Sequence, residues 1–515
     1  MKKNLRKNPR HLPEIKKQHM SLFKKITFKI HQVTGIALSL MFFVWFVSGI
    51  VLIFAGYPHA SREERFLFLK PFSQTDFENA LPLPDSIRGS VELNKLNDKP
   101  VYRVATGKRA QQVFEASTLQ PIPDFPEELC KREAEIFLSS SIKKSVKINE
   151  LDQWTPWSYY QPLLPIYKFY MNDARHTVLY VSSKSGTIIQ QTNRKTRWLA
   201  RMGAIPHWIY FRSLRLKVQL WNQVIIWVSV VGLFASLTGI TAGIIRLNKR
   251  KKWKKTGKIS PYKKFWFKWH HLTGFFFGIF VFTFLLSGLF SVVDLPDWGA
   301  AAKSDFSPRK IWDKSKNAPV NSGHSFLKLW QALENKNGLR TLEWDASMGK
   351  PAWLVYYDHY QVPEVYIATT DTIYKQRPYT LQQVSNRAAK LFKGTIYTIS
   401  EQTEYDNYYQ ESGMFKRPFP IYKISWDDAE QNRIYIDPGT GKVVTSFTRK
   451  SKIHRWLYQG LHKFNFNFLN EYDWLRKILL VILSLGGIVV SLSGVVLSWK
   501  WLSRKLNVKN KRDEN

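Results

Sequence analysis

Four long runs of apolar residues, almost free of charge, divide the chain. They cover roughly residues 32–57, 220–245, 271–293 and 478–497. Each run has the length, about 20 residues, that an α-helix needs to cross the hydrocarbon layer of a bilayer. The segments between the runs alternate short apolar and polar stretches, which indicates strands with occasional amphipathic helices. The pattern therefore predicts a membrane α+β protein with four transmembrane helices and two large domains outside the membrane.

The first of the two long connecting segments shows this alternation clearly. Residues 101–104 and 113–116 have the pattern of paired strands, and residues 127–139 have helical spacing, with Leu129, Ala134 and Phe137 on one side. Two further strands are predicted at 167–170 and 178–181, closed by a turn at 182–186.

The two halves of the chain repeat each other. The stretch Lys25–Gly35 aligns without a gap with Lys264–Gly274, 239 positions later, and the match continues through Ser48-Gly49 and Ser287-Gly288. The second helix of each half matches at an offset of 255, which pairs His207 with His462, Gly232 with Gly487 and Gly239 with Gly494. The sequence thus predicts a duplication of helix, outer domain and helix, arranged as two parallel repeats.

Charge gives the direction of the helices. The formal net charge is +38, and +24 of it is carried by residues 1–30, 246–269 and 500–515. By the positive-inside rule these segments face the cytoplasm, so both termini are expected inside a bacterial inner membrane and both large domains in the periplasm. The predicted boundaries are a basic N-terminus 1–30, helices 31–57, 219–246, 270–294 and 477–499, outer domains 58–218 and 295–476, a basic loop 247–269 and a basic tail 500–515.

The basic charge is accounted for by topology and by contact with anionic membrane lipid, so no nucleic-acid partner is expected. The chain has one cysteine, Cys130, which excludes an intrachain disulfide, a cysteine-based zinc site and a cysteine-ligated iron–sulfur cluster.

Histidines at matching positions are the chemically informative residues. His31 and His270 lie at the inner ends of helices 1 and 3, and His207 and His462 lie just before the outer ends of helices 2 and 4. A histidine near lipid is costly unless it is paired, solvated or ligated. Each one alone fits a hydrogen-bonded interface histidine, but two pairs on opposite faces favour two ligand sites, each holding a flat metal macrocycle. His271 and His454 are weaker candidates, and glycines in the helices either admit a porphyrin edge or serve helix packing.

Several of these motifs together resemble a known family. The stretch Tyr435-Ile-Asp-Pro-Gly-Thr-Gly441, the following His454-Arg-Trp-Leu457, and Lys-x-His-x-x-Thr-Gly at the start of helices 1 and 3 are similar to a PepSY domain joined to a PepSY-associated transmembrane helix. The resemblance covers residues 25–502. It implies PepSY-like outer domains, and four-helix members are often described as iron-regulated inner-membrane proteins, some of them similar to di-haem ferric-siderophore reductases.

The resemblance implies two b-type haems, with His31, His270, His207 and His462 as axial ligands. The expected function is electron transfer across the membrane to a ferric siderophore or another iron chelate; no catalytic residue is assigned. Because the cytoplasmic segments are too short for a nucleotide or flavin domain, the expected donor is membrane quinol or another electron donor. The alternative is a non-enzymatic sensor or scaffold whose outer domains bind a peptide, a protease or a siderophore.

Overall fold

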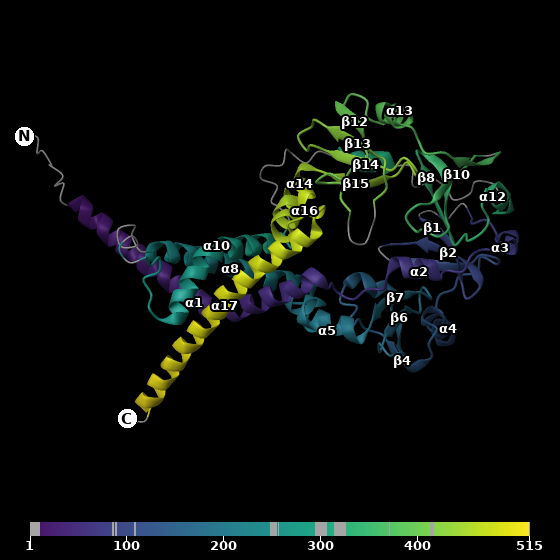
Figure 1. Cartoon of the computed structure of the whole chain (residues 1–515). Coiled ribbons are helices and arrows are strands. Elements are labelled where there is room, and N and C mark those ends of the chain that lie inside the picture. The colour runs from purple at the N-terminus through teal and green to yellow at the C-terminus, as the bar shows by residue number, and fades with distance from the viewer. Residues whose placement is uncertain are drawn as a thin grey trace, which may run out of the picture. The chain divides into compact units, whose positions relative to one another are not determined.

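The protein folds into two compact units (Figure 1). The computed structural model describes residues 11–84, 87, 90–107, 110–247, 255, 257–293, 306–313, 326–369, 371–411 and 417–513, so part of the predicted basic loop and the start of the predicted second outer domain lie outside the described residues. The membrane unit comprises Met1–Gly56, Leu199–Leu295 and His454–Asn515. The sheet unit comprises Tyr57–Trp198 and Pro296–Ile453.

Four long helices form the membrane unit, and each contains one of the predicted apolar runs. Within the described part of the chain, four segments are long and apolar enough to cross a membrane: Leu22–Phe54, Val218–Arg246, Phe265–Leu289 and Asp473–Leu506. The first and last helices extend beyond the predicted spans because lysine, arginine and glutamate are good helix formers once the helix leaves the apolar layer. The four helices are α1 (His11–Phe54), α8 (Val218–Arg246), α10 (Phe265–Leu289) and α17 (Asp473–Asp513).

The four helices pack as a bundle in which α1 and α10 are diagonal partners, because each of them packs against both α8 and α17. Large apolar side chains such as Leu40, Trp227 and Phe234 are exposed on the outside, whereas small and hydroxyl side chains are buried between the helices. This distribution is expected in lipid, where close backbone approach and hydrogen bonding hold helices together. The buried hydroxyl groups of Ser48 and Ser287 donate to carbonyls of their own helices.

Short helices lie near the boundaries between the two units along the chain and carry His207, His454 and His462. They lie just before α8 and α17 in the chain. They are α5 (Arg194–Met202), α6 (Ala204–Trp208), α7 (Arg212–Arg215), α14 (Arg449–Arg455), the π-helical turn η3 (Trp456–Gly460), α15 (Leu461–Lys463) and α16 (Asn467–Asn470).

A seven-stranded antiparallel sheet joins the two halves of the sheet unit. Its strand order is β11-β10-β9-β8-β1-β2-β3, and β1 pairs with β8 so that Glu92 lies opposite Glu343. The predicted pairing of strands 101–104 and 113–116 is confirmed, since Val101 lies opposite Glu115 and Val104 opposite Gln112. The strands are β1 (Val91–Leu96), β2 (Lys99–Ala105), β3 (Gln111–Glu115), β8 (Thr341–Ser347), β9 (Lys350–Tyr356), β10 (Glu364–Ala368) and β11 (Ile373–Gln376).

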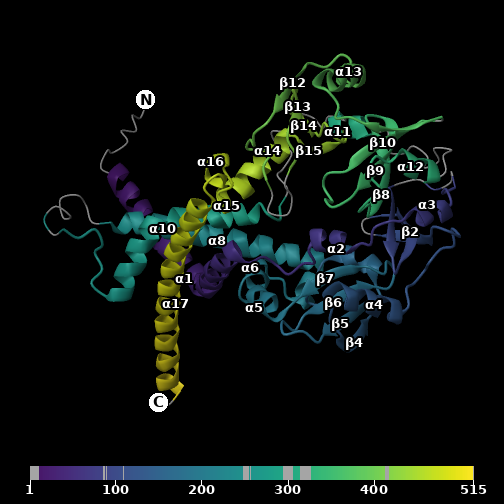
Figure 2. The same ribbon diagram turned by 45° about the vertical axis from the view of Figure 1, so that its right-hand side comes forward.

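Two four-stranded antiparallel sheets follow, one from each half, in the orders β4-β5-β6-β7 and β12-β13-β14-β15 (Figure 2). Helices pack against both sheets: α4 (Glu127–Leu138), as predicted for residues 127–139, packs on β5 and β6, and α13 (Leu381–Leu391) packs on β12. The strands are β4 (Ile142–Ile148), β5 (Ile166–Met171), β6 (Val178–Ser182), β7 (Ile188–Thr192), β12 (Tyr397–Gln402), β13 (Ile421–Trp426), β14 (Arg433–Ile436) and β15 (Val443–Phe447).

The turns after β6 and β14 both contain a glycine with positive φ, Gly186 at 66° and Gly441 at 68°, a conformation that favours glycine. Cys130 lies on the buried face of α4, and burial raises the pKa of its thiol to about 12. The remaining short helices of the sheet unit are α2 (Arg62–Phe68), α3 (Gln74–Asn79), η1 (Ser158–Leu163), α11 (Pro308–Trp312) and α12 (Phe326–Ala332).

Candidate functional site

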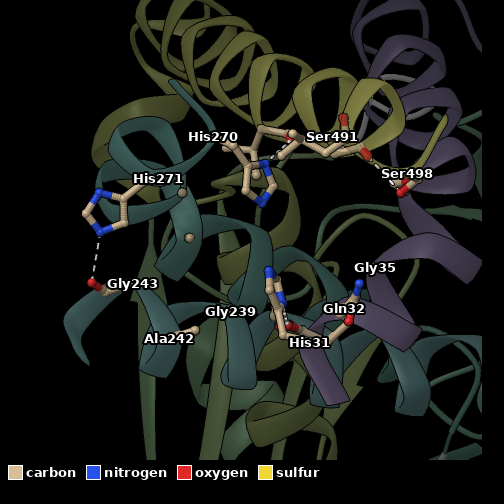
Figure 3. A pocket seen from close by; sticks show the side chains of 18 of the residues that line it. His31, Gln32, Gly35, Gly239, Ala242, Gly243, His270, His271, Ser491 and Ser498 are labelled. Atoms are coloured by element: carbon tan, nitrogen blue, oxygen red, sulfur yellow. Dashed lines mark hydrogen bonds between the residues drawn. The ribbon is translucent and has the colours of Figure 1, made fainter. Parts of the chain in front are cut away.

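A cavity of about 480 Å³ lies within the four-helix bundle. All four long helices line it, and its walls are mainly apolar and glycine-rich. Both His31 on α1 and His270 on α10 line this cavity, together with the weaker candidate His271 (Figure 3). A cavity of this volume is within the range of protein sites for cofactors and other small molecules.

His31 and His270 face each other across the diagonal of the bundle. Their ring centroids are 6.0 Å apart and the rings are inclined by 30°. Figure 3 shows one nitrogen of each ring turned toward the other ring. Two imidazoles bound at about 2 Å to opposite sides of one metal ion would place their centroids about 6 Å apart, once the half-width of each ring is added.

A separation near 6 Å is also ordinary for unligated ring pairs, so the hydrogen bonds carry more weight than the distance. The Nδ1 atom of His31 lies 3.1 Å from the carbonyl oxygen of Ala235, and that of His270 lies 3.2 Å from the carbonyl oxygen of Val490. A carbonyl can only accept, so Nδ1 carries the proton in both rings and Nε2 has a free lone pair. Metal-binding histidines are commonly held in this way, with the second ring nitrogen donating to a carbonyl or carboxylate.

Glycines clear space for both rings. A Cβ atom placed on Gly239 of α8 would lie 2.7 Å from Cε1 of His31, and one placed on Gly494 of α17 would lie 3.6 Å from Cε1 of His270. Gly35 and Gly274 also line the cavity, and a Cβ on either would meet nothing within 4 Å. The glycines therefore serve two purposes: some seat a histidine, and others leave the cavity wall open.

The second pair repeats this arrangement at the other ends of α1 and α10. The ring centroids of His207 and His462 are 6.1 Å apart, at 64°. Nδ1 of His207 donates to the carbonyl of Trp45, 3.0 Å away. Nδ1 of His462 lies 3.0 Å from the hydroxyl oxygen of Ser287, which accepts because its own proton is donated to the carbonyl of Thr283.

These second-pair histidines are neutral. Burial lowers the pKa of His207 to about 4 and, helped by neighbouring His207 and Lys463, that of His462 to about 3. His462 lies two residues after the end of the π-helical turn η3, a type of local widening that is frequent at functional sites. Within the described residues, no protein group hydrogen bonds to Nε2 of His31, His270, His207 or His462.

The contacts of the two halves correspond position by position. The carbonyls of Ala235 and Val490, which hold the first pair, are 255 positions apart, and so are Gly239 and Gly494. In the second pair, the hydroxyl groups of Ser48 and Ser287, which contact Nδ1 of His207 and His462, are 239 positions apart. Gly49 and Gly288, which lie against the rings of His207 and His462, are also 239 positions apart. The same offsets align the two halves of the sequence.

Both weaker candidate histidines are engaged elsewhere. His271 is buried with Nε2 donating to the carbonyl of Gly243 at 3.0 Å and Nδ1 bonded to the hydroxyl of Ser260. Nε2 of His454 donates to the carbonyl of Phe290 at 2.7 Å. Either residue must break a hydrogen bond before that nitrogen can bind a metal, whereas the four matched histidines need not.

The donor set fits a haem better than a bare metal ion. Protein sites for bare metal ions generally use three or more side-chain ligands, and the described residues contain no group of three or more histidine, cysteine, aspartate or glutamate side chains placed to bind one. Two opposed imidazoles supply only the axial positions, and a porphyrin supplies the other four. The paired Nε2 atoms, the glycine-lined walls and the cavity size fit this group at the first pair; the second pair offers the same ligands.

A second cavity, of about 280 Å³, lies in the sheet unit. Its buried cation is Arg103, whose guanidinium donates to the carbonyl of Ser185 at 2.7 Å and to the side chain of Asn94 at 3.2 Å. These bonds tie β1 and β2 to the turn after β6, which is a structural role. Trp154 and Tyr409 are buried in the core of the sheet unit.

The sequence identified the four histidines but not the groups that hydrogen bond to them. Ser48 and Ser287 occupy matched positions in the two halves of the chain, and this correspondence is the sequence signal that could have identified them. The carbonyls of Ala235, Trp45 and Val490 carry no sequence signal, because every residue has a carbonyl group.

Fold and site together define a multi-pass membrane protein with a pair of opposed histidines near each end of a four-helix bundle. The family model described as PepSY-associated TM region matches residues 28–348, and the chain belongs to this family, as the sequence motifs predicted. No curated protein matches the chain.

Replacing Gly239 with alanine tests whether the absence of a side chain at this position makes room for the ring of His31. The new methyl group would lie 2.7 Å from the ring, so the ring must leave the carbonyl of Ala235, and overpacking of this kind costs about 1–3 kcal/mol. If His31 is a haem ligand, Gly239→Ala should lower the haem bound per chain while the protein stays in the membrane. Gly288→Ala is the control, because its methyl would lie 3.8 Å from His462, an ordinary contact. Equal haem content in the two variants would contradict the claim that Gly239 makes room for the ring of His31.

Proposed function

We propose that this protein binds two b-type haems and moves electrons through the membrane to an iron chelate outside. The observation that carries the proposal is the hydrogen bonding of the two histidine pairs: all four Nδ1 atoms are held by neighbouring helices, and all four Nε2 atoms remain available. Isolated interface histidines would instead use their nitrogens for hydrogen bonds, as His271 does.

A haem held by two imidazoles has no open coordination position, which suits one-electron transfer rather than oxygen chemistry. The protein's own contribution is to hold each ring in one tautomer and one orientation. Glycine and serine residues between the helices let the helices pack closely, so that the paired histidines come near each other. The exposed leucines, phenylalanines and tryptophans on the outside of the bundle separate the site from water. His31 and His270 would hold the inner group, and His207 and His462 the outer one.

The proposal of two groups in series is supported by the length of the bundle. Ser48, which contacts the ring of His207, follows His31 by 17 residues on the same helix, or about 25 Å along its axis. One porphyrin cannot reach both pairs. The matched contacts also support the proposal that the chain consists of two parallel repeats, each contributing one histidine to each site.

The direction of the helices is proposed from charge. The basic segments 1–30, 246–269 and 500–515 face the cytoplasm, so the termini lie inside the bacterial inner membrane and the sheet unit in the periplasm. Under this assignment His31 and His270 form the inner pair. The electron donor is membrane quinol or a separate protein, and the acceptor, by the resemblance described above, is a ferric siderophore or another ferric chelate.

Cysteine labelling tests the topology. Native Cys130 should give little background, because it is fully buried and burial raises the pKa of its thiol to about 12. In intact cells with a permeabilised outer membrane, an impermeant maleimide should therefore label Ser117→Cys in the sheet unit and spare Lys258→Cys in the membrane unit. Labelling of position 258 alone would reverse the assignment.

Substitution of the inner pair tests haem ligation. Replacing His31 or His270 with alanine removes one axial ligand, so bound haem should fall by about half, from two per chain toward one. His271→Gln is a matched control, since glutamine stands at the equivalent position 32 of the first repeat. Pyridine haemochrome assay of the purified variants measures the outcome. A wild-type haem content in both alanine variants would exclude these two ligands.

Substitution of the outer pair tests the route to the chelate. His207→Ala or His462→Ala should leave the inner haem reducible by quinol and abolish reduction of an added ferric siderophore. His454→Thr is the control, because threonine occupies the equivalent position 196. Stopped-flow absorbance follows both reactions in one sample. Chelate reduction at the wild-type rate in the alanine variants would leave the outer pair with a purely structural role.

A further inference from the structure

We propose that Arg246 and Arg504 form an anion clamp at the end of the inner cavity, where they bind the carboxylates of the porphyrin. The inference rests on the proposed function and adds residues to it. It begins with the cavity lining, which includes these two arginines but no lysine, aspartate or glutamate. Both arginines are otherwise exposed, so their side chains reach the cavity from the surface of the bundle.

Helix geometry directs both side chains toward the histidines. Arg246 follows Gly239 by seven residues, two turns along the same face of α8, or about 10 Å from the seat of His31. On α17 the lining forms one stripe through Gly494, Ser498, Trp501 and Arg504. Side chains on a helix lean toward its N-terminus. Near the C-terminal ends of α8 and α17 that lean points back into the cavity.

Neither arginine is neutralised by the protein. The Arg246 guanidinium lies 4.6 Å from the centroid of the Phe28 ring, and Nε of Arg504 donates to the carbonyl of Lys500 at 3.0 Å. Among the described residues neither arginine takes part in an ion pair. Two cationic groups therefore face a largely apolar cavity that supplies no carboxylate of its own.

The basic residues that flank the membrane helices do not explain why the two arginines line the cavity. Flanking lysines such as Lys29, Lys264, Lys268 and Lys500 are exposed, as the positive-inside rule requires, and do not line the cavity. Arginine differs from lysine in offering a planar fork that matches a carboxylate or a phosphate through two hydrogen bonds. The ligand chemistry is thus an oxyanion, and its two possible sources are porphyrin carboxylates and a phospholipid headgroup.

Porphyrin binding with and without carboxylates separates these sources. Full-length, haem-depleted protein in nanodiscs is titrated with haem and with haem dimethyl ester, which lacks both anionic groups. Arg246→Gln/Arg504→Gln should weaken the inner-site affinity for haem by on the order of tenfold or more and leave the affinity for the ester unchanged. Lys500→Gln removes the same charge from the same end of α17 and should change neither affinity.

The outcomes distinguish this inference from the proposed function. If the double variant binds haem as tightly as the wild type, or loses affinity equally for haem and ester, the clamp is excluded. Loss of co-purifying anionic phospholipid with unchanged haem affinity would assign the arginines to a headgroup and overturn the inference. A wild-type protein that binds neither porphyrin would overturn the proposed function, and the clamp with it.

Discussion

The hydrogen bond from Nδ1 of each matched histidine to a neighbouring helix is the interaction on which the rest of the site depends. A buried imidazole with no partner costs about 1–3 kcal/mol, and in lipid no water is at hand to replace the bond. The bond removes that cost, selects one tautomer and leaves Nε2 as the available lone pair. It also joins the two long helices of each half of the chain, because His31 of α1 is held by α8 and His270 of α10 by α17.

This bond requires close approach of the helices, and the composition of the bundle interior follows from it. The ring of His31 fits only because residue 239 has no Cβ atom, and the rings of the second pair lie against Gly49 and Gly288. Serine hydroxyls occupy several other interior positions and satisfy their protons on their own helices. Many large apolar side chains are exposed on the outside, where lipid accommodates them, and a few, such as Ile225 and Leu285, are buried.

The sequence contained enough information for the helices, several strands and the four histidines, because hydrophobic period and internal repetition are local or alignable signals. Pairing of β1 with β8 was not predictable, since Val91 and Trp344 are 253 positions apart and the sequence of neither strand indicates which strand it pairs with. The sequence likewise does not indicate which carbonyl groups, such as that of Ala235, accept a hydrogen bond from a histidine. The glycines were recognised, but only the structure separates Gly239, which seats a histidine, from Gly487, which faces Phe46, and Gly35, which faces open space.

The central claim is that each histidine pair holds a haem. Its most direct test is the visible absorption spectrum of the purified full-length protein before and after dithionite, combined with a measurement of haem per chain. The account predicts two b-type haems per chain, with the spectrum of six-coordinate, low-spin iron and a sharpened α-band on reduction. A protein expressed with sufficient haem that shows no Soret band, or whose haem is five-coordinate, would contradict it.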